Sequence, residues 1–231
     1  MTMDVEKLDE ELESKEPQEI LKRAIELFDR IAISFSGAED VVLIDMASKI
    51  KEGIEVFTLD TGRLHPETYD FIDIVRDRYP VKLKVYFPDY REVESLVNKK
   101  GLFSFYADGH EECCGIRKVE PLGRALKDLD CWVTGQRKDS NVTRKDLPVV
   151  QRDPAHEGKV KFNPLANWSL KQLWDYIHRE NVPYNKLHER GFVSIGCAPC
   201  TRAITPGEHE RAGRWWWEDA TKRECGIHLR M

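Results

Sequence analysis

The sequence contains no long apolar run. No stretch approaches the roughly 18 uninterrupted apolar residues that a transmembrane helix needs, and residues 1–19, MTMDVEKLDEELESKEPQE, lack the apolar core of a secretory signal peptide. A basic excess is also missing, because the formal charge is -5 at pH 7, and this argues against nucleic acid or an anionic membrane as a partner. We therefore expect a cytoplasmic protein that binds neither nucleic acid nor membrane.

Internal repeats, low-complexity tracts and a linker between domains are missing as well. A chain of 231 residues is long enough to bury the core of one α/β domain. We expect residues 1–231 to form a single domain with three parts. These are an N-terminal helical segment (1–30), a core (31–200) and a C-terminal segment (201–231).

Hydrophobic periodicity predicts helices that alternate with strands. Apolar residues recur at near-helical spacing in residues 4–30, with an interruption at Pro17. Further helices are expected at 38–51, 65–79, 90–100 and 167–181. Ser169 is a typical N-cap for the last of these helices. Short strands are expected at 31–36, 54–60, 81–87 and 131–136. This alternation predicts an α/β fold with a mainly parallel sheet flanked by helices, followed by an irregular C-terminal tail.

The ends of the first two expected strands carry polar loops. In parallel α/β sheets, ligands bind where strand ends meet helix N-termini. The first loop, SFSGAED, offers the hydroxyls of Ser34 and Ser36, and Gly37 allows a phosphate to approach the backbone; the second, LDTGR, begins at Leu59. We take these four residues as candidate nucleotide-binding residues. The alternative is an ordinary strand-to-helix turn, since the loop matches neither the Walker A nor the GxGxxG pattern.

Two pairs of cysteines have the spacing of metal ligands. Cys113 and Cys114 are adjacent, and Cys197 and Cys200 form the motif CAPC. In a reducing compartment such residues indicate metal ligands or redox groups rather than disulfide bonds. Adjacent cysteines reach two irons of a larger cluster more readily than one zinc ion, so a [4Fe-4S] cluster is favoured, with structural zinc or a redox disulfide as alternatives. Cys131 lies in an apolar strand and is expected to be a buried structural thiol.

Further motifs point to a family. SFSG and LDTG together resemble the loops of the adenine-nucleotide α-hydrolase-like family. The set CCxxRK, TGQR, VPYN, GCAPCTR, GRWWWE and ECGIH is similar, in the same order, to the motifs of the assimilatory adenylyl-sulfate (APS) reductases, within the phosphoadenylyl-sulfate/adenylyl-sulfate (PAPS/APS) reductase family. The resemblance covers most of the chain and implies an adenine-nucleotide α-hydrolase-like fold.

This resemblance also implies an activity, the reduction of adenosine 5′-phosphosulfate to sulfite and AMP in assimilatory sulfate reduction. It implies one [4Fe-4S] cluster on the four paired cysteines, a thioredoxin or glutaredoxin-like reductant, and a homo-oligomer. Residues 31–200 are then the nucleotide- and cluster-binding core, and residues 201–231 are the catalytic tail. Cys225 in ECGIH is the expected nucleophile, and an S-sulfocysteine on it is the expected intermediate. Its basic neighbours Lys222 and Arg223 would favour the thiolate.

The substrate anion requires several cations. Lys118 lies four residues after Cys114, so on a helix it projects from the same side. Arg211 and Arg214 share one face if their segment is helical. The resemblance assigns substrate binding to Lys118, Arg137, Arg211 and Arg214, and possible supporting roles to His110, His228 and Arg202.

Three alternatives remain at this point. A PAPS reductase, or a dual APS/PAPS reductase, would bind the 3′-phosphorylated nucleotide; family members that use PAPS generally lack the two cysteine pairs. An ATP-dependent ligase or sulfurylase of the same superfamily would not need Cys225, and Gly37-Ala38 departs from the Gly-Gly of its phosphate loop. A zinc-stabilised interaction module would contain zinc and have no activity.

Overall fold

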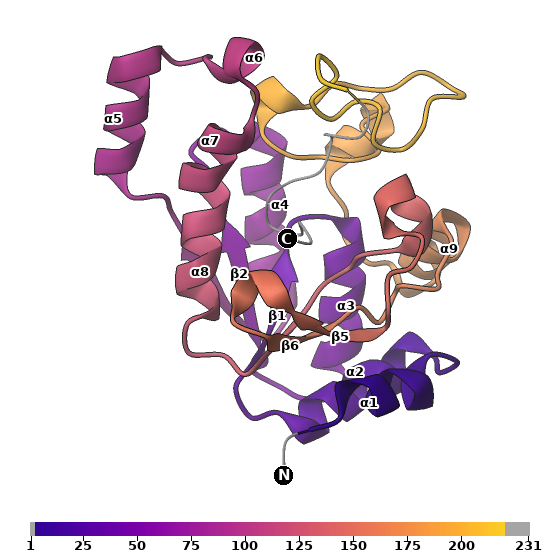
Figure 1. Cartoon of the computed structure of the whole chain (residues 1–231). Coiled ribbons are helices and arrows are strands. Elements are labelled where there is room, and N and C mark those ends of the chain that lie inside the picture. Colours follow the sequence, from indigo (N-terminus) through magenta and orange to yellow (C-terminus); the bar gives the residue numbers. More distant parts are fainter. Residues whose placement is uncertain (1–2, 220–231) are drawn as a thin grey trace.

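A sheet of six strands lies at the centre of the molecule (Figure 1), in the order β3-β2-β1-β4-β6-β5. The computed structural model describes residues 3–219, so Cys225 and His228 lie outside the described residues. Five strands run parallel, and β5 alone pairs antiparallel, with β6. The strands are β1 (Ile31–Phe35), β2 (Glu55–Leu59), β3 (Lys82–Tyr86), β4 (Cys131–Val133), β5 (Val150–Asp153) and β6 (Lys159–Phe162).

Helices connect and cover the strands. They are α1 (Val5–Leu12), α2 (Pro17–Leu27), α3 (Ala38–Ser48), α4 (Pro66–Arg78), α5 (Tyr90–Lys100), α6 (Phe105–Asp108), α7 (Glu111–Cys114), α8 (Glu120–Leu126) and α9 (Leu170–Glu180). A π-helical turn, Gly115–Val119, joins α7 to α8. Short 3-10 turns lie at Lys138–Ser140, Val142–Arg144, Pro154–His156, Lys186–Arg190 and Ala198–Cys200. No helix within residues 3–219 combines the length and the apolar character needed to cross a membrane.

The two faces of the sheet bury different helices, because successive side chains of a strand point to opposite faces. Ile31, Ile33 and Phe35 of β1 pack in a large core with α2, α3, α4 and α9. Ala32, between them, packs on the other face with α8 and with Trp132 of β4. This arrangement, helices on both faces of a mostly parallel sheet, is the α/β architecture that the sequence predicts.

The expected elements are found with small shifts. Helix α5 has the expected bounds, α2 begins at Pro17, and Ser169 caps α9 as expected. The fourth strand is shorter than expected, since β4 ends at Val133 and residues 134–136 form a loop. Cys131 is fully buried in β4, which confirms it as a core thiol.

The sequence reading missed the β5–β6 hairpin and helices α6, α7 and α8. The β5–β6 hairpin consists of strands of four residues, and α6 is also four residues long, which is too short for a clear periodic signal. Helices α7 and α8 are continuous through the π-helical turn, and Gly115 and Pro121 interrupt their sequence pattern. The segment with Arg211 and Arg214 forms turns rather than a helix, so its two arginines do not share a helical face.

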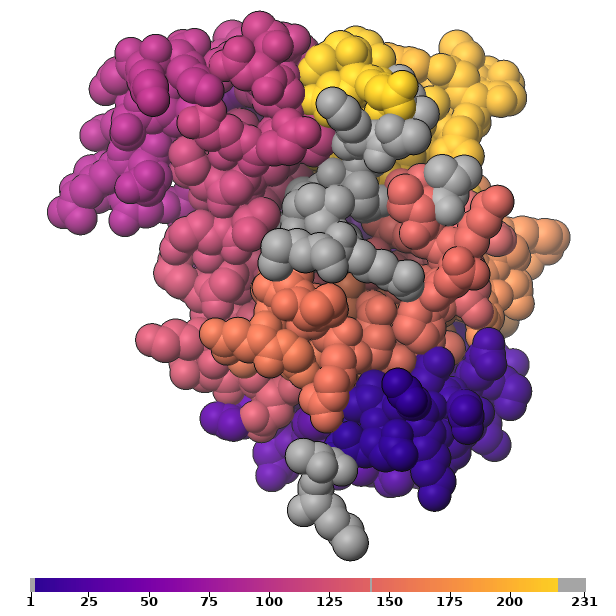
Figure 2. Space-filling model, in the orientation of Figure 1, coloured from indigo at the N-terminus to yellow at the C-terminus, as the bar shows by residue number. Residues whose placement is uncertain are grey.

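The end of the described chain, residues 215–219, lies against helix α6 at one end of the molecule (Figure 2). Trp217 donates a hydrogen bond from Nε1 to the carbonyl of Phe105, at 3.2 Å, and its ring lies 4.4 Å from that of Tyr106. Residues far apart in the sequence are thereby brought beside the paired cysteines of α7.

Candidate active site

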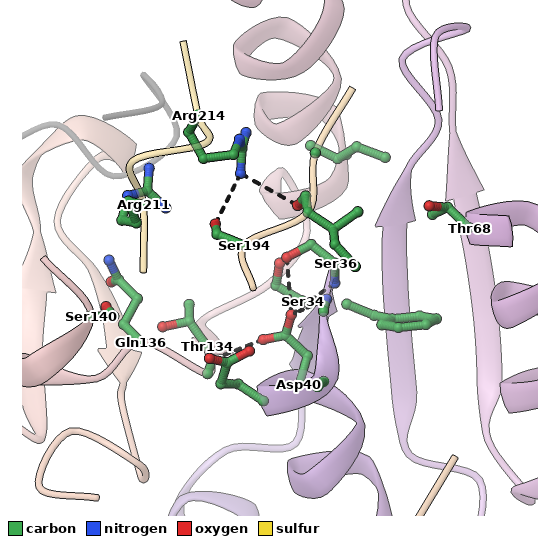
Figure 3. Close-up of a pocket in the computed structure, with 18 of the residues that line it drawn as sticks. Ser34, Ser36, Asp40, Thr68, Thr134, Gln136, Ser140, Ser194, Arg211 and Arg214 are labelled. Atoms are coloured by element: carbon green, nitrogen blue, oxygen red, sulfur yellow. Dashed lines mark hydrogen bonds between the residues drawn. The ribbon is translucent and has the colours of Figure 1, made fainter. Parts of the chain in front are cut away.

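A polar cavity lies at the carboxyl ends of the strands, where β1, β2 and β4 lead into loops. Figure 3 shows Ser34 and Ser36 on one side of it, with Arg211 and Arg214 on the other. Seven of the eight residues predicted to bind the substrate line this cavity: Ser34, Ser36, Gly37, Leu59, Lys118, Arg211 and Arg214. The expected strand-end site is therefore a concavity, with the hydroxyls of Ser34 and Ser36 on one side and the cations of Arg211 and Arg214 on the other.

The loop after β1 is organised by Asp40, in the first turn of α3. One carboxylate oxygen of Asp40 accepts hydrogen bonds from the amides of Ser36 and Gly37, at 2.8 and 3.0 Å, and from the Ser36 hydroxyl at 3.0 Å. The other oxygen accepts from the amide of Gly135, at 2.9 Å. Two backbone amides that the sequence reading left for a phosphate are thus bound to Asp40. The Ser34 hydroxyl and the cations across the cavity remain as the main candidates for nucleotide binding, and the Ser36 hydroxyl can still accept a hydrogen bond.

Burial raises the pKa of Asp40 to about 6, and the neighbouring charge of Glu39 acts in the same direction. The amides of Ser36, Gly37 and Gly135 oppose this shift, because hydrogen bonds favour the ionised carboxylate. Gly135 has to be a glycine here, since a Cβ atom would overlap the side chains of Glu39 and Asp40.

Trp215 brings the cations of the far wall together. Its indole is fully buried, and its backbone has a φ of 40°, in the left-handed region that residues other than glycine seldom adopt. The charged groups of Arg214, Lys118 and Arg211 lie 4.5, 5.7 and 6.0 Å from the ring centroid. Gly196 leaves the room for Arg214, because a Cβ atom there would overlap its guanidinium. One buried aromatic ring thus holds three cations beside the cavity.

Arg137 does not line the cavity. Its side chain is fully buried and forms ion pairs with Glu210, at 2.7 Å, and Glu39, at 3.3 Å, and both of these glutamates do line the cavity. Arg137 therefore ties the segment that carries Arg211 to the N-terminus of α3. This placement fits a positioning role more directly than contact with a substrate.

The four paired cysteines converge on one hollow beside the cavity. It is lined by Cys113, Cys114, Cys197 and Cys200 together with Arg63, Phe105, His110, Arg117, Lys118 and Trp215. Lys118 and Cys197 also line the polar cavity, so the two spaces share these side chains. The sequence predicted this grouping from the spacing of the cysteines and from the position of Lys118.

Local structure holds the two cysteine pairs in place. Cys113 and Cys114 end α7, and the π-helical turn that follows carries Arg117 and Lys118 into the interior. π-Helical turns are frequent at functional sites. On the other side, Thr61 Oγ1 lies 3.2 Å from the sulfur of Cys197, and the amide of Ala198 donates to the carbonyl of Arg63 at 2.8 Å. The loop after β2 therefore supports the CAPC turn.

The thiols lie in a low-polarity environment that also contains cations. Burial raises the pKa of Cys200 to about 12, and the neighbouring Cys197 adds to this shift. Burial likewise raises the pKa of Cys113, while Arg63 and Arg117 act in the opposite direction. A cation bound at the hollow would reverse this balance, because metal ligation requires thiolates.

The spread of the thiols bears on which metal centre they fit. Within residues 3–219, the one set of three or more His, Cys, Asp or Glu ligand atoms that all lie within 4.8 Å of one another is His110, Glu111 and Glu218. It contains none of the cysteines. Zn–S bonds of about 2.3 Å would place four sulfurs about 3.8 Å apart on tetrahedral zinc. No three of the four thiols therefore lie as close to one another as the ligands of one zinc ion would.

The possible supporting residues have different surroundings. His110 lines the cysteine hollow, stacks on Trp215 at 4.3 Å between ring centroids, and lies 2.7 Å from Glu218 through Nδ1. Arg202 pairs with Glu208 at 2.6 Å and lines neither space. Cys225 and His228 are outside the described residues.

Sequence reasoning missed several residues of the site. Asp40, Arg144 and Ser194 line the cavity, and Arg63 lines the cysteine hollow. The motif LDTGR contains Arg63 directly after a predicted strand end, so its position was a usable signal. The segment 193–196 carried no such signal, because it follows no predicted strand and has no periodicity.

Comparison with known proteins identifies the family of the chain. Residues 30–203 match the model of the phosphoadenosine phosphosulfate reductase domain family. The chain is 55% identical to the adenosine 5′-phosphosulfate reductase of Pseudomonas aeruginosa (strain LESB58), over 97% of this chain and 86% of that protein. It is 54% identical to the chloroplastic 5′-adenylylsulfate reductase 3 of Arabidopsis thaliana, over 97% of this chain and 51% of that protein.

Solved structures show the same fold. The phosphoadenylyl-sulfate (PAPS) reductase of Candida auris, in a phosphate complex, superposes with a TM-score of 0.75 at 30% identity, over 88% of this chain and 99% of that chain. An FMN adenylyltransferase of Candida glabrata gives a TM-score of 0.59 at 15% identity, over 93% and 76% of the two chains, and shares the fold alone. The expected adenine-nucleotide α-hydrolase-like fold is confirmed. The chain belongs to the phosphoadenosine phosphosulfate reductase family, within its branch of adenosine 5′-phosphosulfate reductases.

Proposed function

We propose that the chain reduces adenosine 5′-phosphosulfate (APS) to sulfite and AMP in assimilatory sulfate reduction. One observation carries the proposal: a cation-lined cavity at the strand ends adjoins a four-cysteine hollow and shares Lys118 and Cys197 with it. The names of the most similar relatives support the same substrate.

The polar cavity would bind the nucleotide. Ser34 donates a hydrogen bond from its hydroxyl group, and the Ser36 hydroxyl, whose proton is directed at Asp40, accepts one. Lys118, Arg211 and Arg214 bind the phosphosulfate anion. These cations also stabilise the charge that develops on departing AMP. Trp215 positions the three cations, and Arg137 positions the segment that carries Arg211 through its ion pair with Glu210.

Cys225 is the proposed nucleophile. Its thiolate attacks the sulfur of the sulfate group, so a sulfur–sulfur bond forms while the bond from that sulfur to the bridging phosphate oxygen breaks. AMP leaves with the electron pair, and an S-sulfocysteine remains on Cys225. A thiolate of a thioredoxin or glutaredoxin-like dithiol then attacks the sulfur of Cys225 and releases sulfite. The second thiol of the reductant resolves the mixed disulfide, and the dithiol has supplied two electrons.

We further propose one [4Fe-4S] cluster on Cys113, Cys114, Cys197 and Cys200. The donor set fits, because three buried thiols and the half-buried thiol of Cys113 line one hollow, and no three of the four lie within 4.8 Å of one another. When bound, the cluster would cross-link α7 to the CAPC turn and contribute to the electrostatic field around Lys118. The chemical steps above use only the thiols of Cys225 and of the reductant. A homo-oligomer, which the resemblance implies, is part of the same proposal.

Mass spectrometry of the protein after addition of APS, without a dithiol, tests the chemistry. We expect an adduct of about 80 Da, the mass of one sulfonate group, on a peptide that contains Cys225. Adding reduced thioredoxin should remove the adduct and release an equal amount of sulfite. An adduct on another residue, or turnover with no adduct, would reject the mechanism. The same measurement with PAPS, followed by comparison of kcat/KM, separates an APS reductase from a PAPS or dual reductase.

A further inference from the structure

Arg63 lies where the two halves of the cysteine site meet. It ends the motif LDTGR after β2, and its carbonyl accepts the hydrogen bond from Ala198 in the CAPC turn, at 2.8 Å. Its guanidinium lines the hollow that contains Cys113 and donates from Nη2 to the carbonyl of Leu102. Arg63 does not line the nucleotide cavity, in contrast to Lys118.

Aromatic rings hold this guanidinium in place. It lies 5.2 Å from the ring centroid of Phe105, which is itself buried against the cysteines, and 5.5 Å from that of Phe103. The Nη1 atom is buried and has no hydrogen-bond partner within residues 3–219. A buried cationic donor without an acceptor is costly, so a negative group at this position would lower the free energy of the folded protein.

The neighbouring thiol identifies that negative group. Cys113 lines the same hollow as Arg63. A thiolate-bound iron–sulfur centre is stabilised by positive charge and by N–H donors directed at its sulfurs. Cys113, Phe105 and Arg63 line one hollow, and Arg63 has a buried Nη1 without a hydrogen-bond partner within residues 3–219, which meets these requirements.

We propose that Arg63 is the counter-charge of the four-cysteine centre, a positioning residue whose guanidinium neutralises the centre beside Cys113 and slows its loss. This inference rests on the proposed cluster. It separates two tasks: Lys118 faces both the cysteines and the nucleotide cavity, whereas Arg63 acts on the cysteine centre alone.

The test uses the purified holoenzyme and three variants. Arg63→Gln removes the positive charge. Arg63→Lys keeps the positive charge but lacks the planar guanidinium group. Arg91→Gln is the matched control, because Arg91 also lies over an aromatic ring, 5.2 Å from the centroid of Tyr90, but on the exposed helix α5. The rate of cluster loss in excess EDTA is followed by the absorbance at about 400 nm, and iron per chain is measured before and after.

We expect Arg63→Gln to lose the cluster roughly tenfold faster than the wild type. Arg63→Lys and Arg91→Gln should stay close to the wild-type rate. The midpoint potential of Arg63→Gln should also fall, because the reduced centre gains a negative charge that is no longer compensated; a tenfold shift of a one-electron equilibrium is about 59 mV. The dissociation constant of AMP should not change.

Other results would overturn the inference. Equal rates for Arg63→Gln and Arg91→Gln would show that Arg63 does not act on the centre. Equally fast loss in Arg63→Gln and Arg63→Lys would assign Arg63 to aromatic packing rather than charge. A wild-type protein without iron would reject the proposed cluster itself, and with it this inference, whereas a brown wild type with insensitive variants rejects the inference alone.

Discussion

At the scale of single residues, Asp40 is unusual because it is a buried carboxylate surrounded by donors rather than by cations. It accepts three backbone N–H groups and one hydroxyl, and only 6% of the residue is exposed. Burial nevertheless raises its pKa to about 6. The folded protein therefore binds a proton at Asp40 more tightly than the unfolded chain does. For this reason, the contribution of Asp40 to the free energy of unfolding decreases as pH rises.

The direction of this pH dependence gives the first prediction. Asp40→Asn removes the titrating group, so the wild-type minus variant difference in unfolding free energy should fall as pH rises from about 4 to about 6, by at most about 1.4 kcal/mol per pH unit. Urea unfolding of both proteins across this range measures the difference. Between about pH 7 and 8 the difference should be constant, because Asp40 is ionised in both states; this range is the internal control. A difference that grows with pH would contradict the raised pKa.

Site residues could be predicted from the sequence where the residue type has few possible roles in a protein. Paired cysteines have few alternative roles, so Cys113, Cys114, Cys197 and Cys200 could be grouped from spacing alone. Asp40 could not, because an acidic residue in the first turn of a helix is ordinary, and its buried contact with Gly135 is made across 95 residues. Trp215 was missed for a similar reason, since three consecutive tryptophans do not indicate which one is buried.

At the scale of elements, the sequence at the start of α9 predicts an N-terminal cap, and the structure contains this cap. Ser169 accepts a hydrogen bond from the amide of Gln172, at 3.3 Å, and the side chain of Gln172 accepts one from the amide of Ser169, at 2.9 Å. This reciprocal pair satisfies two amides that lack partners within the helix. The chain that follows α9 leads into residues 193–197, which line the cavity.

Ser169→Ala should therefore lower the free energy of unfolding without changing the polar cavity or the cysteine hollow. We expect a loss of about 1 kcal/mol in unfolding free energy, which corresponds to a fall of roughly 2–4 °C in Tm for a domain of this size. Ser169→Asp keeps an acceptor and is the matched control, with a Tm near that of the wild type. Calorimetry measures both, and the rate of sulfite release per folded molecule should be unchanged. An unaltered Tm in Ser169→Ala would show that the cap contributes nothing here.

Elements that lack a local signal mark the limit of sequence reading. The helices that pack in the large core were predicted within a few residues. Helices α1, α2 and α9 have a regular apolar face, whereas α3 is buried on nearly all sides. The helix Glu111–Leu126 was missed as a unit because Gly115, the π-helical turn and Pro121 interrupt its pattern. This irregularity is also what directs Lys118 toward the hollow, so the local signal is weakest where the site is built.

At the scale of the whole molecule, the strand order β3-β2-β1-β4 places the ends of β1, β2 and β4 beside one another. A reversal of strand order beside β1 is where parallel sheets bind ligands, so the position of the polar cavity could be predicted from the alternation of elements. The cysteine hollow could not be placed in this way. It depends on contacts between the loop after β2, helix α7 and the segment 197–217, and these contacts follow from tertiary packing rather than from strand order.

The separation of the two spaces leads to a last prediction, which assigns different tasks to different cysteines. Cys225→Ser should retain the iron content and brown colour of the wild type and should bind AMP, but it should release no sulfite, because only the nucleophile is lost. Cys200→Ser removes one buried ligand from the hollow and should lower iron per chain sharply, since each ligand of a four-cysteine centre contributes to its affinity. Elemental analysis, the absorbance at about 400 nm and sulfite assays of both variants give the comparison. A colourless Cys225→Ser would mean that the ligand assignment is wrong, and zinc in place of iron in the wild type would exclude the cluster.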